Sequence, residues 1–356
     1  MLKICSVIGA RPQFIKSSPL TSALTNKFHE IMINTGQHYD HEMSTAFFEE
    51  LNLPKPKYNL EIGSGKQGEQ TAAMLSSLED VFINEDPSAV VVYGDTNSTI
   101  AGALAAAKLH IPVIHVEAGL RSYNKTMPEE INRIVTDHVS DFLFVPSATS
   151  KNNLLKEGIV DGVHIVGDIM YDSILNHGPK ARESSKILDK LKINNEKYYL
   201  ATIHRAENTD NESRLRSIIE SFSKIDAIVI MPLHPRTKKL MNEYSLNPAN
   251  NIKIIDPVGY LDILRLMQQS SAVLTDSGGV QKETYYLKVP CITLRGETEW
   301  TETVEAGWNK IVDVDPVKIL DAVNTSDSVK EKSHPKLYGD GDTAIKIVDV
   351  LTKSLI

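Results

Sequence analysis

Short runs of apolar, β-favouring residues recur along the chain, and each is followed by a longer segment with apolar positions at helical spacing. This alternation predicts parallel sheets covered by helices. The expected strands of the first half are 3–8, 30–34, 89–93, 113–116, 142–145 and 163–166. Those of the second half are 198–203, 227–231, 252–255, 272–275, 291–294 and 310–312.

Each half holds enough strands for a complete doubly wound sheet, which predicts an α/β fold of two Rossmann-like domains. A chain of 356 residues also exceeds what one hydrophobic core usually serves. We expect a first domain at 1–170, a linker at 171–197 and a second domain at 198–341, facing each other across a ligand-binding cleft at the carboxyl ends of both sheets. The last segment, 342–356, is expected to form a helix that packs on either domain, with apolar positions at Ile345, Val348, Leu351 and Leu355.

The composition is that of an ordinary globular protein, with 41% apolar and 24% charged residues. The formal net charge is −8 and no basic run exceeds the Lys238–Lys239 pair, so we expect no nucleic-acid partner. Cys5 and Cys291 stand inside apolar runs without the spacing of a disulfide framework, which indicates a reducing compartment. No stretch approaches about 18 apolar residues, so we expect a soluble, cytoplasmic protein without a membrane partner.

The histidines do not predict a metal site. His38 and His41 suggest a metal pair, but no second pair of ligands with suitable spacing accompanies them and the HExxH pattern is absent. His115 and His138 are expected to be core or helix-face residues. No cofactor is expected either, because the loop at 9–16 has one glycine where the dinucleotide fingerprint needs three.

Cationic side chains follow several expected strands. Arg11 and Lys16 lie near a helix N-terminus, where free N–H groups favour anions, so a phosphate ligand and a pair of solvated side chains are equally good interpretations. His204 and Arg205 follow one strand of the second half, and the segment 232–236 offers another His and Arg after the next. The pairing at two neighbouring strand ends favours a clamp for a diphosphate.

The second half also contains a glycine-rich turn after the strand at 272–275. Gly278 and Gly279 would let a phosphate approach the backbone, and Ser277 offers a hydroxyl donor. Glu283 follows at a spacing that suits a hydrogen bond to a ribose diol. The alternative is an ordinary tight turn capped by Ser277, and the acid at this offset favours the nucleotide interpretation.

Carboxylates gather at expected strand ends of the first half. Asp95 and Glu117 each follow a strand, and Glu129 and Glu130 stand in the expected loop segment 127–133. Such acids are candidates for general acid and base catalysis. Taken singly, Asp95 fits a helix cap and the two glutamates fit partners of the helix dipole. Their combination with an expected phosphate site favours catalysis.

Taken together, these motifs resemble the family of non-hydrolysing UDP-N-acetylglucosamine 2-epimerases, in order across nearly the whole chain. The resemblance implies a glycosyltransferase-B-like fold, a C-terminal helix that returns to the first domain, a homodimer, and a place in the synthesis of surface polysaccharide precursors. The matching segments are Gly9–Pro12 with Lys16, Thr35–His38, Gly94–Thr96, His115–Arg121, Pro128–Glu130 with Asn132 and Arg133, His204–Asn208, Asp276–Gly279 with Gln281 and Glu283, and Thr298–Glu299.

The resemblance also implies a mechanism and a set of site residues. The C2 hydrogen of an N-acetylhexosamine has no neighbouring carbonyl to acidify it, so UDP leaves from C1 as a base removes the C2 proton. UDP then adds back to the 2-acetamidoglucal intermediate, which is protonated on the other face. The implied catalytic residues are Asp95, Glu117, Glu129 and His204. The implied substrate-binding and UDP-binding residues are Arg11, Lys16, Arg121, Asn132, Arg133, Arg205, Tyr260, Ser277, Gly278, Gly279, Glu283 and Arg295.

Two features depart from the family members that act on UDP-N-acetylglucosamine. The first is Trp300, which stands where those members usually show Arg and resembles the branch acting on UDP-2,3-diacetamido-2,3-dideoxy-glucuronate. Arg121 or Lys125 would then meet the extra carboxylate of that sugar. The second concerns allosteric activation by a second substrate molecule, which is not implied because Asp40, Glu69 and Ile134 replace the polar residues that bind the activator.

Three other functions remain as alternatives. A UDP-sugar glycosyltransferase on the same fold would keep the UDP residues but needs only one acid or base. A hydrolysing epimerase would admit water to the glycal and release free N-acetylmannosamine. A non-catalytic nucleotide-sugar sensor would explain the glycine-rich turn but not the acids.

Overall fold

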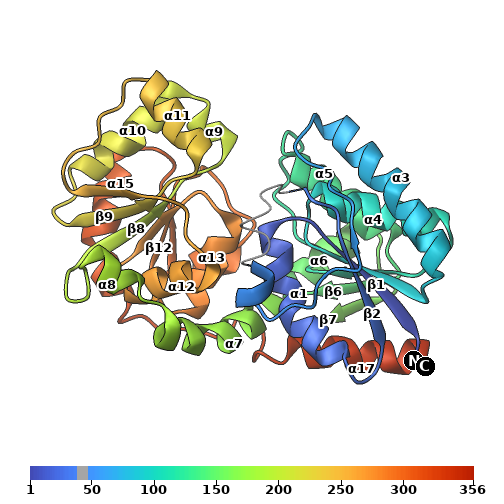
Figure 1. The fold of residues 1–356 in the computed structure, drawn as a ribbon. Helices are drawn as coiled ribbons and strands as arrows, with labels where there is room; N and C mark the ends of the chain where they lie inside the picture. Colours follow the sequence, from blue (N-terminus) through green and yellow to red (C-terminus); the bar gives the residue numbers. More distant parts are fainter. Residues whose placement is uncertain (38–46) are drawn as a thin grey trace. The chain divides into compact units, whose positions relative to one another are not determined.

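The computed structural model describes residues 1–37 and 47–356. His38, Asp40 and His41 lie outside the described residues. The chain divides into two compact units (Figure 1). Unit 1 comprises Met1–Asn176 with Tyr338–Ile356, and unit 2 comprises His177–Leu337.

The helices of unit 1 are α1 (Arg11–Leu24), α3 (Gln67–Glu85), α4 (Asn97–Lys108), α5 (Pro128–Val139), α6 (Ala148–Lys156) and α17 (Thr343–Leu355). Those of unit 2 are α8 (Ile187–Leu191), α9 (Ala206–Thr209), α10 (Glu212–Ser223), α11 (Pro235–Glu243), α12 (Tyr260–Gln269), α13 (Gly278–Tyr286), α14 (Thr301–Glu305), α15 (Pro316–Asn324) and α16 (Ser326–Val329). The division between the units falls inside α7 (Ile169–Ser184). The segment expected as a linker is therefore largely helical, since it contains most of α7 and all of α8.

Unit 1 is built on a parallel seven-stranded sheet with the order β3-β2-β1-β4-β5-β6-β7. Its strands read as continuous apolar runs because helices cover both faces. On one face α3 and α4 lie side by side, and their apolar residues pack against Cys5 and Val7 of β1 (Figure 1). The strands are β1 (Lys3–Ile8), β2 (His29–Asn34), β3 (Tyr58–Asn59), β4 (Ala89–Tyr93), β5 (Val113–Val116), β6 (Phe142–Val145) and β7 (Val163–Ile165).

Unit 2 repeats this plan with a parallel six-stranded sheet in the order β10-β9-β8-β11-β12-β13. Its core joins Ile218 and Phe222 of α10 to sheet residues such as Val229 and Leu274. The strands are β8 (Tyr198–Thr202), β9 (Ile228–Pro232), β10 (Ile252–Ile255), β11 (Val273–Thr275), β12 (Cys291–Thr293) and β13 (Asn309–Ile311).

The strand order changes direction at one place in each sheet, between β1 and β4 in unit 1 and between β8 and β11 in unit 2. The loops that follow these neighbouring strands diverge, and open α/β sheets bind their ligands at this place. The expected fold class of two Rossmann-like domains is confirmed. The change in strand order also indicates where each unit would bind a ligand.

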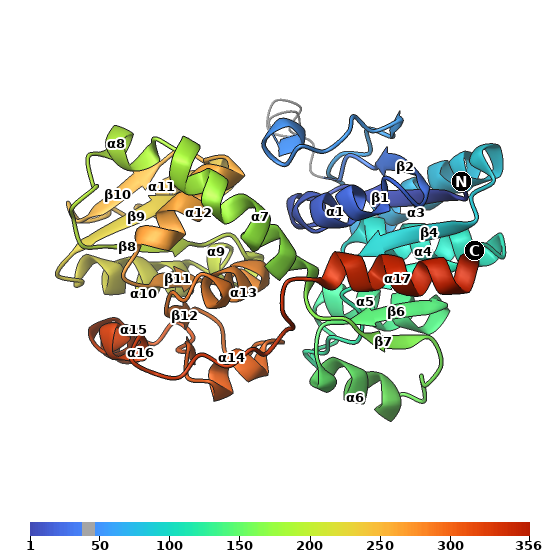
Figure 2. The same ribbon diagram turned by 90° about the horizontal axis from the view of Figure 1, so that it is seen from below.

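The C-terminal helix α17 belongs to unit 1 and packs against α1 (Figure 2). Its first turn is capped from α7, because the carboxylate of Asp172 accepts hydrogen bonds from the N–H groups of Thr343 at 3.2 Å and Ala344 at 2.8 Å. Ile347 is buried and Ile345 is 62% exposed. The expected apolar face was therefore wrong at Ile345, because the helix is rotated so that Ala344 and Ile347 face the core.

Candidate active site

The loop after β1 is tied to the end of β4 by Gln13. Its Oε1 accepts hydrogen bonds from the N–H groups of Gly9 at 2.9 Å and Ala10 at 3.1 Å, and its Nε2 donates to the carbonyl oxygen of Tyr93 at 3.1 Å. Gly9 admits no larger residue, because an added Cβ would lie 1.9 Å from Oγ1 of Thr35. The two loops at the switch point of unit 1 are thus held as one assembly.

A buried ion pair stands at the same place. Nζ of Lys16 on α1 lies 2.5 Å from Oε1 of Glu117, which follows β5. Both side chains are less than a tenth exposed, at 8% and 5%. Glu117 has a φ of +72°, a left-handed conformation that is strained for a residue other than glycine. Gly94, at φ +63°, makes room for the pair, since a Cβ there would lie 2.9 Å from Lys16 Nζ.

Arg11, the other cation of this loop, begins α1. Its guanidinium carbon lies 4.8 Å from the centroid of the Phe47 ring, within cation–π range. The side chain is partly exposed at the N-terminus of α1. The sequence-predicted Arg11 and Lys16 therefore differ in environment, one partly solvated and the other buried beside a carboxylate.

Asp95 follows β4 and is held from α5. Arg133 donates to its Oδ2 from Nε at 2.9 Å and from Nη2 at 2.6 Å, and Nδ2 of Asn132 donates to its backbone carbonyl at 2.9 Å. The cap of α4 is Thr96 instead of Asp95. The carboxylate of Asp95 remains a quarter exposed, so it is both fixed and open to a ligand.

The two glutamates that begin α5 differ in role. Glu130 is fully buried and accepts hydrogen bonds from the backbone N–H groups of Ser122 and Tyr123 and from Nη1 of Arg133. Burial alone would raise the pKa of Glu130, but these donors hold it below its usual value. Glu129 is partly exposed and makes no hydrogen bond or ion pair among the described residues, which leaves its carboxylate available.

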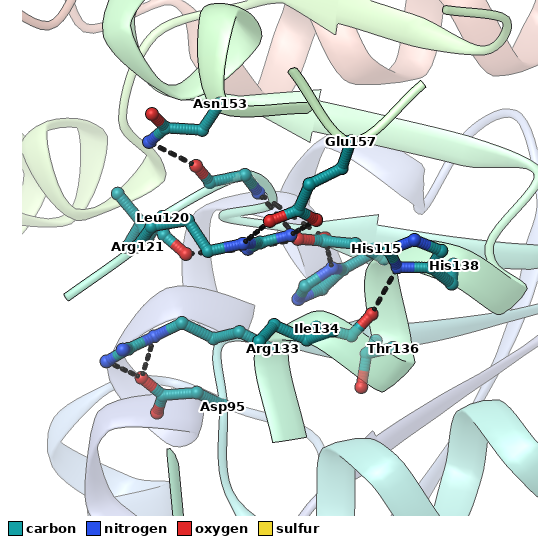
Figure 3. A network of polar contacts seen from close by, with 12 residues as sticks. Asp95, His115, Leu120, Arg121, Arg133, Ile134, Thr136, His138, Asn153 and Glu157 are labelled. Carbon is teal, nitrogen blue, oxygen red and sulfur yellow. Dashed lines mark hydrogen bonds and ion pairs between the residues drawn. The ribbon is translucent and has the colours of Figure 1, made fainter. Parts of the chain in front are cut away.

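Arg121, which was expected to contact the substrate, is bound to other residues of unit 1 in this structure. Its side chain is fully buried, and its guanidinium donates to both oxygens of Glu157, at 2.8 and 2.7 Å, and to Oδ2 of Asp137 at 2.7 Å (Figure 3). A contact with a ligand would require breaking these bonds. Arg121 instead ties the loop before α5 to α5 and to the end of α6.

The same network contains His115, whose surroundings the sequence did not reveal. The ring is fully buried on β5, as expected for a core residue. Its Nδ1 lies 2.7 Å from Oδ1 of Asp137, and its Nε2 lies 2.7 Å from the carbonyl oxygen of Gly94. Asp137 lies in the last turn of α5 and matches no motif, so no pattern in the sequence signalled this pairing.

In unit 2, Asp276 joins the two loops of the switch point. Its buried carboxylate accepts hydrogen bonds from the N–H groups of His204 and Arg205, both at 3.1 Å, and from Nδ2 of Asn208 at 3.1 Å. The His204 ring is 56% exposed, with Nδ1 3.3 Å from Asp276. The guanidinium of Arg205 is partly exposed and makes no hydrogen bond or ion pair within the described part of the chain.

The glycine-rich turn forms the start of α13. Ser277 is the N-cap, and its Oγ accepts the N–H of Val280. A Cβ on Gly278 would lie 2.3 Å from Oε1 of Glu299, so the position requires glycine, whereas Gly279 meets only Oγ of Ser277 at 4.0 Å. The N–H groups of this first turn are suited to bind an anion.

The remaining expected residues of unit 2 are more deeply placed. Glu283 on α13 is 5% exposed. Arg295 is 2% exposed and its Nη1 lies 3.0 Å from Oε2 of Glu299. Tyr260 at the start of α12 is fully buried, and its ring packs edge-to-face on His177. The structure therefore does not support contact of the Tyr260 side chain with a ligand.

The second His and Arg segment does not form a free phosphate clamp in this structure. Nη2 of Arg236 donates to both carboxylate oxygens of Asp210, at 2.5 and 2.7 Å, on the surface. Within residues 1–37 and 47–356, no group of three or more His, Cys, Asp or Glu side chains could hold a metal ion. None of the helices in that part of the chain is long and apolar enough to cross a bilayer.

Comparison with known proteins covers nearly all of the chain. A model of the UDP-N-acetylglucosamine 2-epimerase family matches residues 22–352. The chain is 51% identical to a UDP-N-acetylglucosamine 2-epimerase homolog of Methanococcus maripaludis, over 98% of this chain and 99% of that protein. It is 46% identical to the UDP-2,3-diacetamido-2,3-dideoxy-D-glucuronate 2-epimerase of Pseudomonas aeruginosa, over 99% of this chain and 100% of that protein.

Solved structures give the same result. A crystal structure of Methanocaldococcus jannaschii UDP-GlcNAc 2-epimerase in complex with UDP-GlcNAc and UDP has a TM-score of 0.93 at 46% identity, and the match covers 99% of this chain and 100% of that chain. Solved structures of similar fold also include a glycosyltransferase, which confirms the expected glycosyltransferase-B-like class. The chain therefore belongs to the UDP-N-acetylglucosamine 2-epimerase family, a family of isomerases.

Proposed function

We propose that the chain interconverts UDP-N-acetylglucosamine and UDP-N-acetylmannosamine by inverting C2 of the sugar. The observation that carries this proposal is the Lys16–Glu117 ion pair, buried next to the Arg133-bound carboxylate of Asp95 at the switch point of unit 1. Two fixed carboxylates at one strand-end position suit a reaction that removes a proton from one face of a carbon and returns one to the other.

The chemistry proceeds without a net change in atoms or electrons. A carboxylate takes the C2 proton while the bond between C1 and the β-phosphate oxygen breaks, and the electron pair leaves with UDP. A double bond forms between C1 and C2. In the return step the phosphate oxygen adds to C1 and C2 receives a proton on the opposite face. We assign this proton transfer to Asp95, Glu117 and Glu129, with His204 as a further donor.

We assign UDP binding to the start of α13 and to the cations of the two switch points. The first-turn N–H groups of Gly278 and Gly279, with the Ser277 hydroxyl, suit the diphosphate. Arg205 is supported by its uncommitted guanidinium, and Glu283 is assigned to the ribose diol. Arg11 and Lys16 complete the UDP set. We assign Asn132 and Arg133 to the part of the site that binds the sugar, where they hold Asp95.

The alternative substrate is UDP-2,3-diacetamido-2,3-dideoxy-glucuronate, which the name of the Pseudomonas aeruginosa relative supports at 46% identity. Its carboxylate at C6 needs a cationic partner. Arg121 was one candidate, and its commitment to Asp137 and Glu157 removes it. Lys125, which is exposed, is the other candidate. Because Lys125 is then the one remaining candidate partner for the carboxylate at C6, UDP-N-acetylglucosamine is the first substrate to test.

The test is proton NMR of the purified protein with UDP-N-acetylglucosamine in deuterated water, without added nicotinamide or metal. UDP-N-acetylmannosamine with deuterium at C2 is the expected product. Free N-acetylmannosamine and UDP would show hydrolysis instead. Turnover of the diacetamido-glucuronate nucleotide alone would establish the alternative substrate. No product and no deuterium with either nucleotide would overturn epimerisation as the function.

A further inference from the structure

His115 occupies a position that links the proposed catalytic carboxylates to the interior of unit 1. It lies on β5, two residues before Glu117, and pairs with Val92 of the neighbouring strand β4. Its ring is inaccessible to solvent, so it cannot touch a substrate. Any effect of His115 on the reaction must therefore pass through the groups that its two ring nitrogens contact.

The hydrogen bonds of the ring define where its protons are. Nε2 lies 2.7 Å from the carbonyl oxygen of Gly94, and a carbonyl oxygen only accepts, so Nε2 carries a proton. Nδ1 lies 2.7 Å from Oδ1 of Asp137. Either Nδ1 also carries a proton, or the Asp137 carboxyl does. The partners of Asp137 decide between these two states.

Asp137 is surrounded by donors. Its Oδ2 accepts from Nη1 of Arg121 at 2.7 Å and from the N–H of Gly119 at 3.2 Å, and Oδ1 lies 3.3 Å from the same N–H. Burial alone would raise the pKa of Asp137, but the charges and hydrogen bonds of its partners hold it below its usual value. Because the Arg121 guanidinium and the N–H of Gly119 already donate to the two oxygens, Asp137 acts as an acceptor, and we place the proton between it and the ring on Nδ1.

Arg121 bridges two carboxylates, Asp137 of α5 and Glu157 after α6 (Figure 3). The side chain of Glu157 is 26% exposed, whereas those of His115, Asp137 and Arg121 are inaccessible to solvent. Asp137 is therefore the buried carboxylate that faces the ring, and Arg121 fixes its position.

The bond from Nε2 acts on the peptide that precedes Asp95. The N–H of Gly94 donates to the carbonyl oxygen of Val116 at 3.0 Å, so His115 and Val116 together hold Gly94 on both sides. Gly94 in turn lies against Nζ of Lys16. The position of Gly94, held through the peptide groups on both of its sides, thus sets both the start of Asp95 and the space for the Lys16–Glu117 pair.

We propose that His115 is a positioning residue, held as a buried imidazolium between Asp137 and Gly94, that fixes the loop presenting Asp95 beside the Lys16–Glu117 pair. The inference rests on the proposed acid and base roles of Asp95 and Glu117. The charged groups around the ring are Asp137, Arg121 and Glu157, and Lys16 and Glu117 lie next to Gly94.

The first test measures the ring directly. Nitrogen-15 NMR of the full chain with labelled histidine, with the His115 signals identified by their loss in His115→Gln, should show both ring nitrogens protonated. A His115 ring with one unprotonated nitrogen would overturn the proposal. This measurement does not depend on enzymatic activity. The only folded variant that it needs is the one used to assign the His115 signals, and His115→Asn can replace His115→Gln for that purpose.

The second test separates positioning from a merely structural role. His115→Asn removes the donor to Gly94, and misplacement of catalytic groups by about 1 Å costs about 10²-fold in rate, so kcat should fall by about that factor with KM little changed. His115→Gln, which retains an N–H near the place of Nε2, should recover part of kcat. His138→Gln is the matched control, since His138 is exposed on α5 and bonds only within its helix, to Ile134.

The outcomes distinguish this inference from the proposed function. If the wild-type protein epimerises C2 and folded His115→Asn keeps its kcat, the positioning role is wrong while the function stands. If the wild-type protein shows no exchange at C2, the proposed function fails, and the NMR signature still decides whether the ring is charged.

Discussion

Arg133 holds Asp95 by a single carboxylate oxygen. Both of its contacts, from Nε at 2.9 Å and from Nη2 at 2.6 Å, end on Oδ2. Among residues 1–37 and 47–356, no group donates a hydrogen bond to Oδ1 of Asp95, whose side chain is 25% exposed. The guanidinium therefore orients the carboxylate and leaves its second oxygen without a donor among these residues, as the proposed role of Asp95 in proton transfer requires.

Asp95→Asn should remove this proton acceptor while preserving the shape of the side chain. We expect kcat for C2 epimerisation to fall by about 10²- to 10⁴-fold, the usual worth of a general acid or base. UDP affinity, measured by calorimetry, should stay within about twofold, because UDP is assigned to other residues. Asp349→Asn, on the exposed side of α17, is the control. Unchanged turnover in Asp95→Asn would remove Asp95 from the mechanism.

Gly94→Ala should disturb the Lys16–Glu117 pair. The added Cβ would lie 2.9 Å from Nζ of Lys16, and φ is +63°, where a side chain costs about 1–2 kcal/mol. We expect a lower free energy of unfolding in urea by that amount, together with a loss of kcat. Gly68→Ala in α3 is the matched control, because its Cβ meets nothing within 4 Å and should stabilise the helix slightly. Equal stability of the two variants would contradict the crowding at Gly94.

Glu283→Ala should raise the apparent KM for the nucleotide sugar. Loss of a hydrogen bond to a charged group costs about 1.5–3 kcal/mol, which corresponds to a rise in KM of about tenfold or more, with a smaller change in kcat. Steady-state kinetics of Glu283→Ala and of Glu220→Ala, on the exposed side of α10, would check this. If KM is the same in both variants, Glu283 does not bind the ribose.

Glu85→Gln should change how unit 1 responds to acid. Hydrogen bonds from Lys57 at 2.6 Å and Tyr58 at 2.5 Å, together with Lys3, lower the pKa of Glu85 to about 2, from 4.5 for a free glutamate. A carboxyl whose pKa is lower in the folded state stabilises that state above the unfolded pKa, and this contribution is lost as pH falls through the folded one.

The variant should therefore unfold at a lower urea concentration than the wild type at pH 7. The difference between their urea midpoints should become smaller as the pH falls from 4.5 to 2. Asp80→Asn, exposed on α3, should show neither effect. A gap that stays constant with pH would mean that the carboxylate charge of Glu85 is not what stabilises this cluster.

Every strand expected from an apolar run is present in the structure, and its ends lie within one residue of the expected positions. The reason is that strands buried on both faces need continuous apolar sequence. They did not predict β3, Tyr58–Asn59, which has no apolar run and exists through its pairing with Ile33 and Asn34 of β2. An edge strand of this kind is defined by its neighbour and not by its own residues.

In the candidate site, too, the sequence predicted some features and missed others. Asp95 and Glu117 could be placed at strand ends from sequence, since parallel strands bring their carboxyl ends to one edge. The contact of Lys16 with Glu117 joins residues 101 positions apart, and that of Arg121 with Glu157 joins residues 36 apart. Such pairs depend on how helices pack. The sequence therefore suggested a ligand contact for Arg121, although its guanidinium is paired with Asp137 and Glu157 inside unit 1.

The return of the chain to unit 1 has a consequence for synthesis on the ribosome. Unit 2 is continuous in sequence, but unit 1 needs Tyr338–Ile356, which is translated after all of unit 2. Until then Asp172 has no helix to cap, and the surface of α1 that α17 covers stays exposed to solvent or to a chaperone. Unit 2 should therefore complete its folding before unit 1, although most of unit 1 is synthesised first.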